Sequence, residues 1–324
     1  GEEVMQEQGR KLKIFMANSN PKLAKDIARE LNCELGESEI SRFSDGETSV
    51  SIHESVRGAD CFIIQSTSYP VNENLMELLI MIDAMKRASA ARITVVMPYF
   101  GYARQDRKAR PRSPISAKLV ADLITTAGAD RILTMELHAL QIQGFFNIPV
   151  DHIISAPLFT SHIKAQPEFD PEKFTVLAPD FGSVSRARQF ATRLGCPVAI
   201  IDKRRPKPNV SEVMNIIGDV RDKHIIVVDD IIDTAGTICN AANAVIEKAG
   251  ARDVYVYASH AVLSGPAIEN LKNGPIKKAT FLNTINVPEE KMIDKFTVLN
   301  VAPVISEAIN RIHKDTPVST MILE

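Results

Sequence analysis

Three carboxylates and a run of small residues follow one another in the second half of the chain. Asp229, Asp230 and Asp233 precede Thr234, Ala235, Gly236 and Thr237. Small residues let backbone N–H groups close around an anion, and the helix expected from about residue 238 adds partial positive charge at its start. We expect a sugar-phosphate cradle here, with Asp229 and Asp230 hydrogen-bonding vicinal hydroxyls or a cation. The alternative is an Asp-rich turn in which Asp233 or Thr234 caps the helix.

A cluster of permanent positive charges follows the expected strand 93–99. It consists of Arg104, Arg107, Lys108, Arg110 and Arg112. A guanidinium presents a planar fork that matches two phosphate oxygens, so the cluster suits a triphosphate, and the neighbouring Tyr99, Phe100 and Tyr102 offer stacking surface for a base. A merely solvated loop is the alternative.

A second basic stretch follows the expected strand 198–201. Lys203, Arg204, Arg205 and Lys207 are interleaved with Pro206 and Pro208. We interpret this stretch as a stiffened, mobile arm that closes over transferring phosphates and neutralises developing charge. A solvated turn is again the alternative.

Two further groups of residues are weaker candidates. Phe43 could stack on an adenine while Asp45 or Glu47 accepts a hydrogen bond from its exocyclic amine, although this segment also reads as a common surface turn. Glu136 and His138 lie two apart on an expected strand and so face the same way, and Asp180 closes another strand. Magnesium contacts could come from His138 and Asp180, although a lone histidine is more often structural.

The elements that position these residues alternate between apolar strand-like runs and amphipathic stretches, as in α/β folds with parallel sheets. Residues 127–139 align without gaps onto residues 249–261, each copy being a helix end, an Ala-Gly-Ala stop, a strand and a His-Ala. At 324 residues, two domains are expected. We predict a duplicated fold with domains at 11–155 and 156–302, followed by a terminal helix and tail at 303–324 whose packing partner is left open.

Composition excludes several classes of protein. A net charge of -2 lacks the basic excess of a nucleic-acid binder, and no stretch reaches the length of a membrane span. Cys33, Cys61, Cys196 and Cys239 are widely scattered, which predicts free thiols in a reducing compartment, so a cytoplasmic location is expected.

A helix is predicted over residues 75–85, capped by Asn74 with Glu77 three residues later. It is apolar nearly all round, which favours self-association of the chain.

Taken in order, these segments closely resemble class I phosphoribosyl pyrophosphate (PRPP) synthetases, from about Leu12 to Ser319. The matching stretches are 43–47, 74–80, 102–106, 137–139, 141–146, 203–205 and 229–237. The resemblance implies two tandem, duplicated phosphoribosyltransferase-like domains, each a central parallel sheet flanked by helices. It also implies a homo-oligomer, typically a hexamer.

The resemblance also assigns roles to residues. It implies that Asp45, Gly46, Glu47, Arg104 and Gln105 bind ATP, to which we add Phe43 and Asp106 from the same stretches. It implies that His138 and Asp180 bind Mg²⁺, that Lys203 and Arg205 stabilise the transferring group, and that Asp229 and residues 233–237 bind ribose 5-phosphate, with Arg205 reaching it. Asp230 is included with this last set.

The implied activity is that of a ribose-phosphate diphosphokinase feeding nucleotide biosynthesis. O1 of ribose 5-phosphate attacks the β-phosphorus of ATP, which gives PRPP and AMP. The sequence supplies cations and carboxylates but no obvious nucleophile, as phosphoryl-type transfer requires. The alternatives are a catalytically silent homologue acting as a regulatory partner, or a phosphoribosyltransferase. A PRPP-sensing transcription regulator would require a DNA-binding segment that the sequence lacks.

The chain departs from the family pattern at several positions. Glu136 stands where the family usually has Asp, and Ser183 replaces a glycine. Residues 316–321 depart from the ending that contributes to the regulatory phosphate-and-ADP site of the family. Phosphate activation and ADP inhibition therefore do not follow from the sequence.

Overall fold

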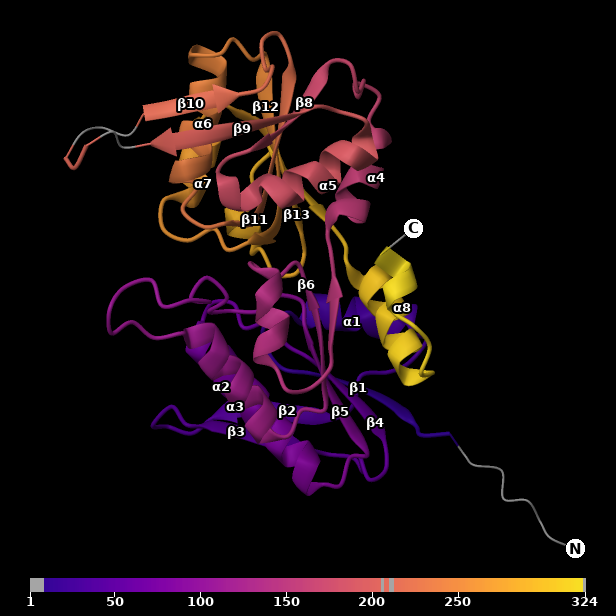
Figure 1. Cartoon of the computed structure of the whole chain (residues 1–324). Coiled ribbons are helices and arrows are strands. Elements are labelled where there is room, and N and C mark those ends of the chain that lie inside the picture. Colours follow the sequence, from indigo (N-terminus) through magenta and orange to yellow (C-terminus); the bar gives the residue numbers. More distant parts are fainter. Residues whose placement is uncertain (1–8, 205–206, 210–212, 323–324) are drawn as a thin grey trace, which may run out of the picture. The chain divides into compact units, whose positions relative to one another are not determined.

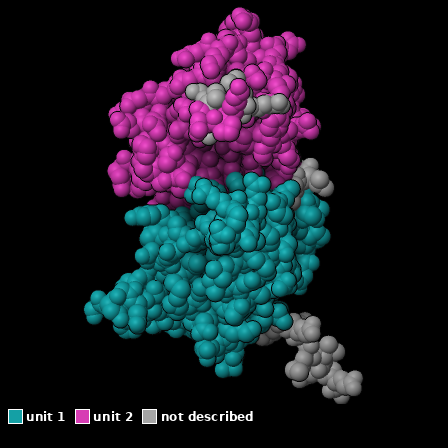
Figure 2. Space-filling model, turned by 60° about the vertical axis from the view of Figure 1, so that its left-hand side comes forward, with its two compact units in different colours: residues 1–153, 301–323 teal, residues 154–300, 324 magenta. Residues whose placement is uncertain are grey.

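The structure of the protein, a computed structural model, describes residues 9–204, 207–209 and 213–322. These residues form two compact units, one of residues 9–153 and 301–322 and one of residues 154–300 (Figure 2). The predicted domain borders at 155/156 and 302/303 lie within two residues of these changes. Among the described residues no helix is long and apolar enough to cross a membrane.

Unit 1 is built around a parallel sheet with the order β1-β4-β5-β6-β7 (Figure 1). Its strands are β1 (Leu12–Met16), β4 (Asp60–Ile64), β5 (Arg92–Met97), β6 (Arg131–Met135) and β7 (Val150–Ile153), and β2 (Ser38–Arg42) and β3 (Thr48–Ile52) form a separate antiparallel hairpin. The helical elements are α1 (Pro21–Glu30), α2 (Val71–Arg87), α3 (Ser116–Ala127), η1 (Leu140–Phe145), α8 (Ala302–His313) and η4 (Ser319–Ile322). Strands buried on both faces explain the continuous apolar runs of the sequence.

One face of the sheet in unit 1 packs in a core with two helices. Cys61 and Ile63 of β4 pack with the buried faces of α2 and α3. Helices α1 and α8 pack on each other, with Ile305 and Ile309 of α8 buried. The terminal helix, whose partner the sequence left open, therefore belongs to unit 1.

Unit 2 contains a seven-stranded sheet with the order β10-β9-β8-β11-β12-β13-β14. Its strands are β8 (Phe174–Ala178), β9 (Val198–Arg204), β10 (Val213–Ile217), β11 (His224–Ile232), β12 (Asp253–Ala261), β13 (Ile276–Leu282) and β14 (Phe296–Leu299). Its helical elements are α4 (Ala156–Lys164), η2 (Phe181–Ser183), α5 (Val184–Leu194), α6 (Gly236–Glu247), α7 (Ala267–Asn273) and η3 (Glu289–Lys291). All strand pairs are parallel except β9 with β10.

The sequence repeat corresponds to a repeated strand–helix–strand unit. In unit 1 the unit is β5–α3–β6, and in unit 2 it is β11–α6–β12, with the two strands adjacent and parallel in both cases. Gly128 and Gly250 of the two Ala-Gly-Ala stops have φ of 125° and 74°, values that favour glycine. The predicted duplicated α/β fold is confirmed.

Helix α2 differs from its sequence-based description. It begins at Val71 with Pro70 at the N-cap, so Asn74 lies inside the helix and its Nδ2 donates to the Ser68 carbonyl at 2.9 Å. The predicted cap at Asn74 is wrong, because the helix begins a turn earlier and the Asn74 side chain bonds back to the segment before it. Most of its apolar surface is buried within unit 1, so α2 does not by itself require a second subunit.

Candidate active site

The turn between β11 and α6 has the features of an anion-binding site. Ala235 adopts a left-handed conformation with φ of 68° and is the N-cap of α6, so its own side chain provides no capping hydrogen bond. The N-cap position is therefore held by Ala235 and not by Asp233 or Thr234, the two residues proposed as caps. The backbone N–H groups of the first turn and the positive end of the helix dipole are arranged as they are in phosphate-binding loops.

Asp229 and Asp230 lie within β11, which continues past the apolar run of the sequence to Ile232. The longer strand results from pairing with β12, which continues to Ile232, while pairing with β8 stops at Val227. Burial, and then the adjacent Asp230, raise the pKa of Asp229 well above its ordinary value, while Arg186 acts in the opposite direction. Two neighbouring carboxylates of this kind favour a hydrogen-bond donor or a cation as their ligand.

Asp180 organises the turn that follows β8. Its Oδ1 accepts a hydrogen bond from the N–H of Ser183 at 3.0 Å, so the side chain caps η2. Ser183, one of the departures from the family pattern, is 4% exposed. Its hydroxyl-bearing side chain is therefore accommodated inside the fold, and Asp180 stays exposed.

The second basic stretch is partly a packed element. Lys203 and Arg204 belong to β9, where Lys203 faces Met214 of β10 in an antiparallel pair at the edge of the sheet (Figure 1). The prediction of an unpacked arm is wrong for these two residues, because cross-strand pairing with β10 orders them. Lys207 to Asn209 form a turn, and the predicted catalytic residue Arg205 lies outside the described residues.

The arginine-rich loop of unit 1 leaves β5 and reaches α3. Arg104, Arg107, Lys108, Arg110 and Arg112 are all exposed. Gln105 accepts a hydrogen bond on its Oε1 from the Ser116 hydroxyl at 2.6 Å, and its backbone carbonyl accepts from the N–H of Ala117 at 3.1 Å. Asp106 accepts from Nε2 of Gln141 at 3.0 Å. Hydrogen bonds therefore hold Gln105 and Asp106 at the start of the loop, while the basic side chains of the loop are exposed to solvent.

The aromatic residues beside this loop do not form the stacking surface that the sequence suggested. Tyr99 and Phe100 are 6% and 2% exposed, and Phe100 packs edge-on against Phe146. Only Tyr102 is partly exposed, and its hydroxyl donates to Oδ1 of Asn72. The prediction for Tyr99 and Phe100 is wrong, because apolar residues that directly follow a buried strand continue into the core.

The segment from Phe43 to Glu47 is the turn of the β2–β3 hairpin. Gly46 has φ of 96°, and Oδ1 of Asp45 accepts from the N–H of Glu47 at 3.0 Å. Phe43 is 58% exposed. A large aromatic ring held in solvent on an ordered turn is available for stacking on a ligand.

His138 and Glu136 do not share one face of a strand. Strand β6 ends at Met135, and Glu136 has left-handed φ of 40° and is 6% exposed, whereas His138 is exposed. The prediction that they face the same way is wrong, because a left-handed residue interrupts the alternation of a strand. Leu137 donates its N–H to Nε2 of His152 at 2.9 Å, which fixes the turn before His138.

The described residues of neither unit form a ready-made metal site. Over the described parts of the chain, no three His, Cys, Asp or Glu side chains gather closely enough to hold a metal ion. His138 belongs to unit 1 and Asp180 to unit 2. A cation such as Mg²⁺ commonly takes few protein ligands and completes its shell with phosphate oxygens and water, so each of these exposed side chains, taken on its own unit, fits a metal that arrives with a nucleotide.

Unit 1 also has a pocket of about 340 Å³ that the sequence did not reveal. Its lining includes Asn18, Arg42 and Glu77. Glu77 is 1% exposed, and its Oε2 lies 3.6 Å from Nη2 of Arg42. Burial raises the pKa of the Glu77 carboxyl group. The signal in the sequence is the charged Glu77 within the otherwise apolar helix α2, a position that the capping-box pattern also explains.

The chain is similar to proteins of one family along nearly its whole length. Residues 12–128 match the N-terminal domain of ribose phosphate pyrophosphokinase, and residues 203–322 match the phosphoribosyl synthetase-associated domain. A ribose-phosphate pyrophosphokinase of Clostridium tetani is 61% identical over 98% of this chain and 99% of its own, and one of Clostridium perfringens is 59% identical over 97% and 98%. The crystal structure of phosphoribosylpyrophosphate synthetase from Mycobacterium smegmatis superposes with a TM-score of 0.89 at 43% identity, covering 94% of this chain and 100% of that one.

Proposed function

The chain belongs to the ribose-phosphate pyrophosphokinase family and is an enzyme of that activity, and from this premise we propose its substrates and the residues that bind them. The pyrophosphoryl group of ATP is transferred to O1 of ribose 5-phosphate, which gives PRPP and AMP. O1 attacks the β-phosphorus, the bond from that phosphorus to the α-phosphate oxygen breaks, and the O1 proton is released to solvent or to a nearby base. The product supplies nucleotide biosynthesis.

Ribose 5-phosphate binds to the domain predicted at 156–302. The start of α6 is the observation that carries this assignment, since it combines a left-handed Ala235 at the N-cap, a run of small residues and the positive end of the helix dipole. The 5-phosphate is held by Asp233, Thr234, Ala235, Gly236 and Thr237. Asp229 and Asp230 accept hydrogen bonds from the ribose hydroxyls, a role that suits carboxylates one of which has a raised pKa.

ATP binds to the domain predicted at 11–155. Arg104 receives the phosphates from a loop whose first residues are anchored to α3 and η1, and Gln105 and Asp106 complete the ATP site beside it. Phe43 stacks on the adenine from the β2–β3 turn, beside Asp45, Gly46 and Glu47. The exposure of Phe43 and of the loop arginines supports these roles.

Lys203 and Arg205 are the proposed catalytic residues, and Arg205 also contacts ribose 5-phosphate. Lys203 extends from a strand held by β10, so its ammonium group starts from a fixed backbone. A cation positioned in this way stabilises the negative charge that develops during transfer more than the charge of the ground state.

His138 and Asp180 are the proposed Mg²⁺ ligands, with the phosphates of ATP as the others. When bound, Mg²⁺ supplies charge neutralisation to the transferring group. The exposure of both side chains supports their access to a nucleotide-borne ion. Asp180 is also a hydrogen-bonded carboxylate with a fixed orientation.

The protein is proposed to act in the cytoplasm as a homo-oligomer, a hexamer by analogy with the family. Its four cysteines are free thiols, as expected in a reducing compartment. Leu119 and Leu123 of α3 are 59% and 38% exposed and lie four residues apart with Ile115 before them, so they form an apolar stripe on one face of the helix. Light scattering of the purified chain tests the assembly, and a monomer at micromolar concentration would contradict it.

The reaction is tested with purified protein, Mg²⁺, ATP and ribose 5-phosphate carrying ¹⁸O at C1. We expect AMP to appear in equal amounts with PRPP, and the ¹⁸O to be retained in PRPP because O1 is the attacking atom. Loss of the label would contradict this route. AMP formation only after a base and PRPP are added would indicate a phosphoribosyltransferase, and no AMP at all would indicate a silent homologue.

A further inference from the structure

The candidate phosphate loop, residues 233–237, accepts hydrogen bonds from the segment that follows β12. Ser264 donates its backbone N–H to the Asp233 carbonyl at 3.1 Å, and its hydroxyl donates to Oδ1 of the same residue. Asn270 of α7 donates from Nδ2 to the Thr234 carbonyl at 2.9 Å. Because a carbonyl oxygen only accepts, the amide nitrogen of Asn270 must face it.

This segment is itself firmly anchored within unit 2. Lys291 donates from Nζ to the Leu263 carbonyl at 3.0 Å, and Lys295 donates to the carbonyls of Leu271 and Gly274 at 2.8 and 3.1 Å. Leu271 is fully buried in the core that also contains α6. These contacts therefore hold the backbone of α7, which carries Asn270, in place.

The hydrogen bond from Asn270 has a geometric consequence for the loop. In a trans peptide the C=O and the next N–H lie in one plane and point in opposite directions. When Asn270 holds the carbonyl of Thr234, it directs the N–H of Ala235 away from α7. Ala235 is left-handed at φ of 68°, a conformation that costs an alanine free energy and persists where the surroundings impose it.

We propose that Asn270 and Ser264 are positioning residues that preset the 5-phosphate loop of the ribose 5-phosphate site. They contact the loop and not the ligand, so they act on ligand affinity through the backbone of residues 233–235. This role rests on the proposed binding of ribose 5-phosphate at residues 233–237. Preorganisation of this kind lowers the ordering cost at the moment of binding.

Asn270→Asp is the sharpest test because it keeps the size of the side chain and removes the N–H donor. We expect the KM for ribose 5-phosphate, and its Kd by calorimetry, to rise about 3- to 10-fold, as for the loss of one hydrogen bond, with KM for ATP and kcat changed less than about twofold. Asn273→Asp on the same helix is the matched control, since Asn273 is exposed, and it should change none of these values. An equal rise in KM for ATP, or the same effect in the control, would overturn the proposal.

Two further variants separate the positioning role from the site assignment. Thr237→Ala alters the loop directly: if it raises KM for ribose 5-phosphate and Asn270→Asp does not, the positioning role is wrong and the site stands. If neither variant changes that KM, the proposed ribose 5-phosphate site is wrong. Should Asn270→Asp fail to fold, Ser264→Ala replaces it, with the same expected selectivity for ribose 5-phosphate over ATP.

Discussion

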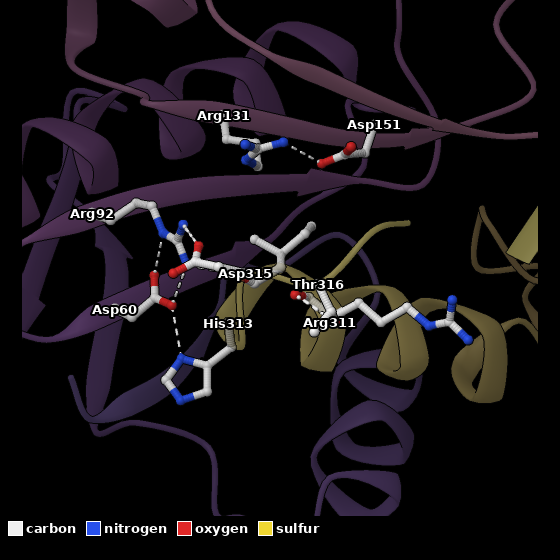
Figure 3. A network of polar contacts seen from close by, with 9 residues as sticks. Asp60, Arg92, Arg131, Asp151, Arg311, His313, Asp315 and Thr316 are labelled. Carbon is white, nitrogen blue, oxygen red and sulfur yellow. Dashed lines mark hydrogen bonds and ion pairs between the residues drawn. The ribbon is translucent and has the colours of Figure 1, made fainter. Parts of the chain in front are cut away.

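Nδ1 of His313 lies 2.8 Å from Oδ2 of Asp60, which joins the last turn of α8 to a carboxylate in β4 (Figure 3). Arg92 contacts both oxygens of Asp60, at 2.9 and 2.7 Å, and donates to the Ile312 carbonyl at 2.9 Å. Asp60 is 1% exposed. The buried carboxylate of Asp60 thus connects the last turn of α8 to the sheet of unit 1.

Asp60→Asn is expected to destabilise unit 1 by about 2 kcal/mol, because a buried ion pair with Arg92 and a hydrogen bond to His313 are weakened together. Urea unfolding should show a lower midpoint, and hydrogen exchange in α8 should accelerate. The control is Asp83→Asn, which breaks an exposed pair with Arg87 and should cost less than about 0.5 kcal/mol. Equal shifts in the two variants would contradict a special role for Asp60.

The position of α8 illustrates where sequence reasoning stops. Its apolar residues recur at helical spacing, which is typical of a helix with one buried face, and Ile305, Ile309 and Ile312 are buried. Periodicity does not say which surface covers that face. The partner depends on contacts such as Ser306 with the Ile27 carbonyl, 279 positions apart in the chain, and no local pattern encodes them.

Gly101→Ala tests the start of the arginine-rich loop. The N–H of Gly101 donates to Oγ1 of Thr67 at 2.7 Å, and a Cβ at this position would lie 2.3 Å from the Thr67 carbonyl oxygen. We expect a loss of about 2 kcal/mol in stability from this overlap and a higher KM for ATP. Gly144→Ala, where a Cβ meets nothing within 4 Å, should shift stability by less than about 1 kcal/mol. An unchanged melting temperature in Gly101→Ala would show that the loop relaxes freely.

The local parts of the candidate site were predictable and the tertiary parts were not. The strand, the small residues and the helix around residues 225–247 were all visible as a pattern, because each depends on neighbours in sequence. The pairing that extends β11 to Ile232 and the pairing of Lys203 with β10 depend on distant strands. Charge and proline content therefore predicted an unpacked arm at Lys203 where a strand exists.

Lys203→Ala is expected to lower kcat by about 100-fold or more while KM for both substrates changes less than about threefold. A cation that acts mainly on developing charge contributes to the transition state and little to ground-state binding. Steady-state kinetics with ATP and ribose 5-phosphate measure both quantities. Lys164→Ala, an exposed lysine of α4 in the same unit, is the control and should leave kcat unchanged. A matching rise in KM would instead assign Lys203 to simple substrate binding.

The four thiols are expected to be unreactive in the folded protein. Burial raises the pKa of Cys61 to about 12 and that of Cys196 to about 11, and it also raises the pKa of Cys33 and Cys239. At pH 8 the thiolate fraction of Cys61 is then about 10⁻⁴. Iodoacetamide should modify all four residues at least about tenfold more slowly than in urea, as followed by mass spectrometry. Rapid labelling without denaturant would contradict this.

Asp229→Asn is expected to reveal how the ligand site depends on pH. Burial and the neighbouring Asp230 raise the pKa of Asp229, so the folded chain keeps this proton to a higher pH than the unfolded chain does. The stability that this proton contributes is complete below the unfolded pKa of about 4 and is lost as the pH rises through the raised folded pKa. In the protein without ligand, ionisation of Asp229 therefore opposes folding.

The variant should melt at a higher temperature than the unmodified chain, with a difference that grows from pH 5 to pH 8, although it binds ribose 5-phosphate about tenfold more weakly or worse. Thermal melts across this range without ligand measure the first effect, and calorimetry measures the second. Asp294→Asn changes an exposed carboxylate and should leave the pH dependence as it is. A difference that shrinks as the pH rises would mean that Asp229 is stabilised as a carboxylate, with Arg186 outweighing the effects of burial and of Asp230.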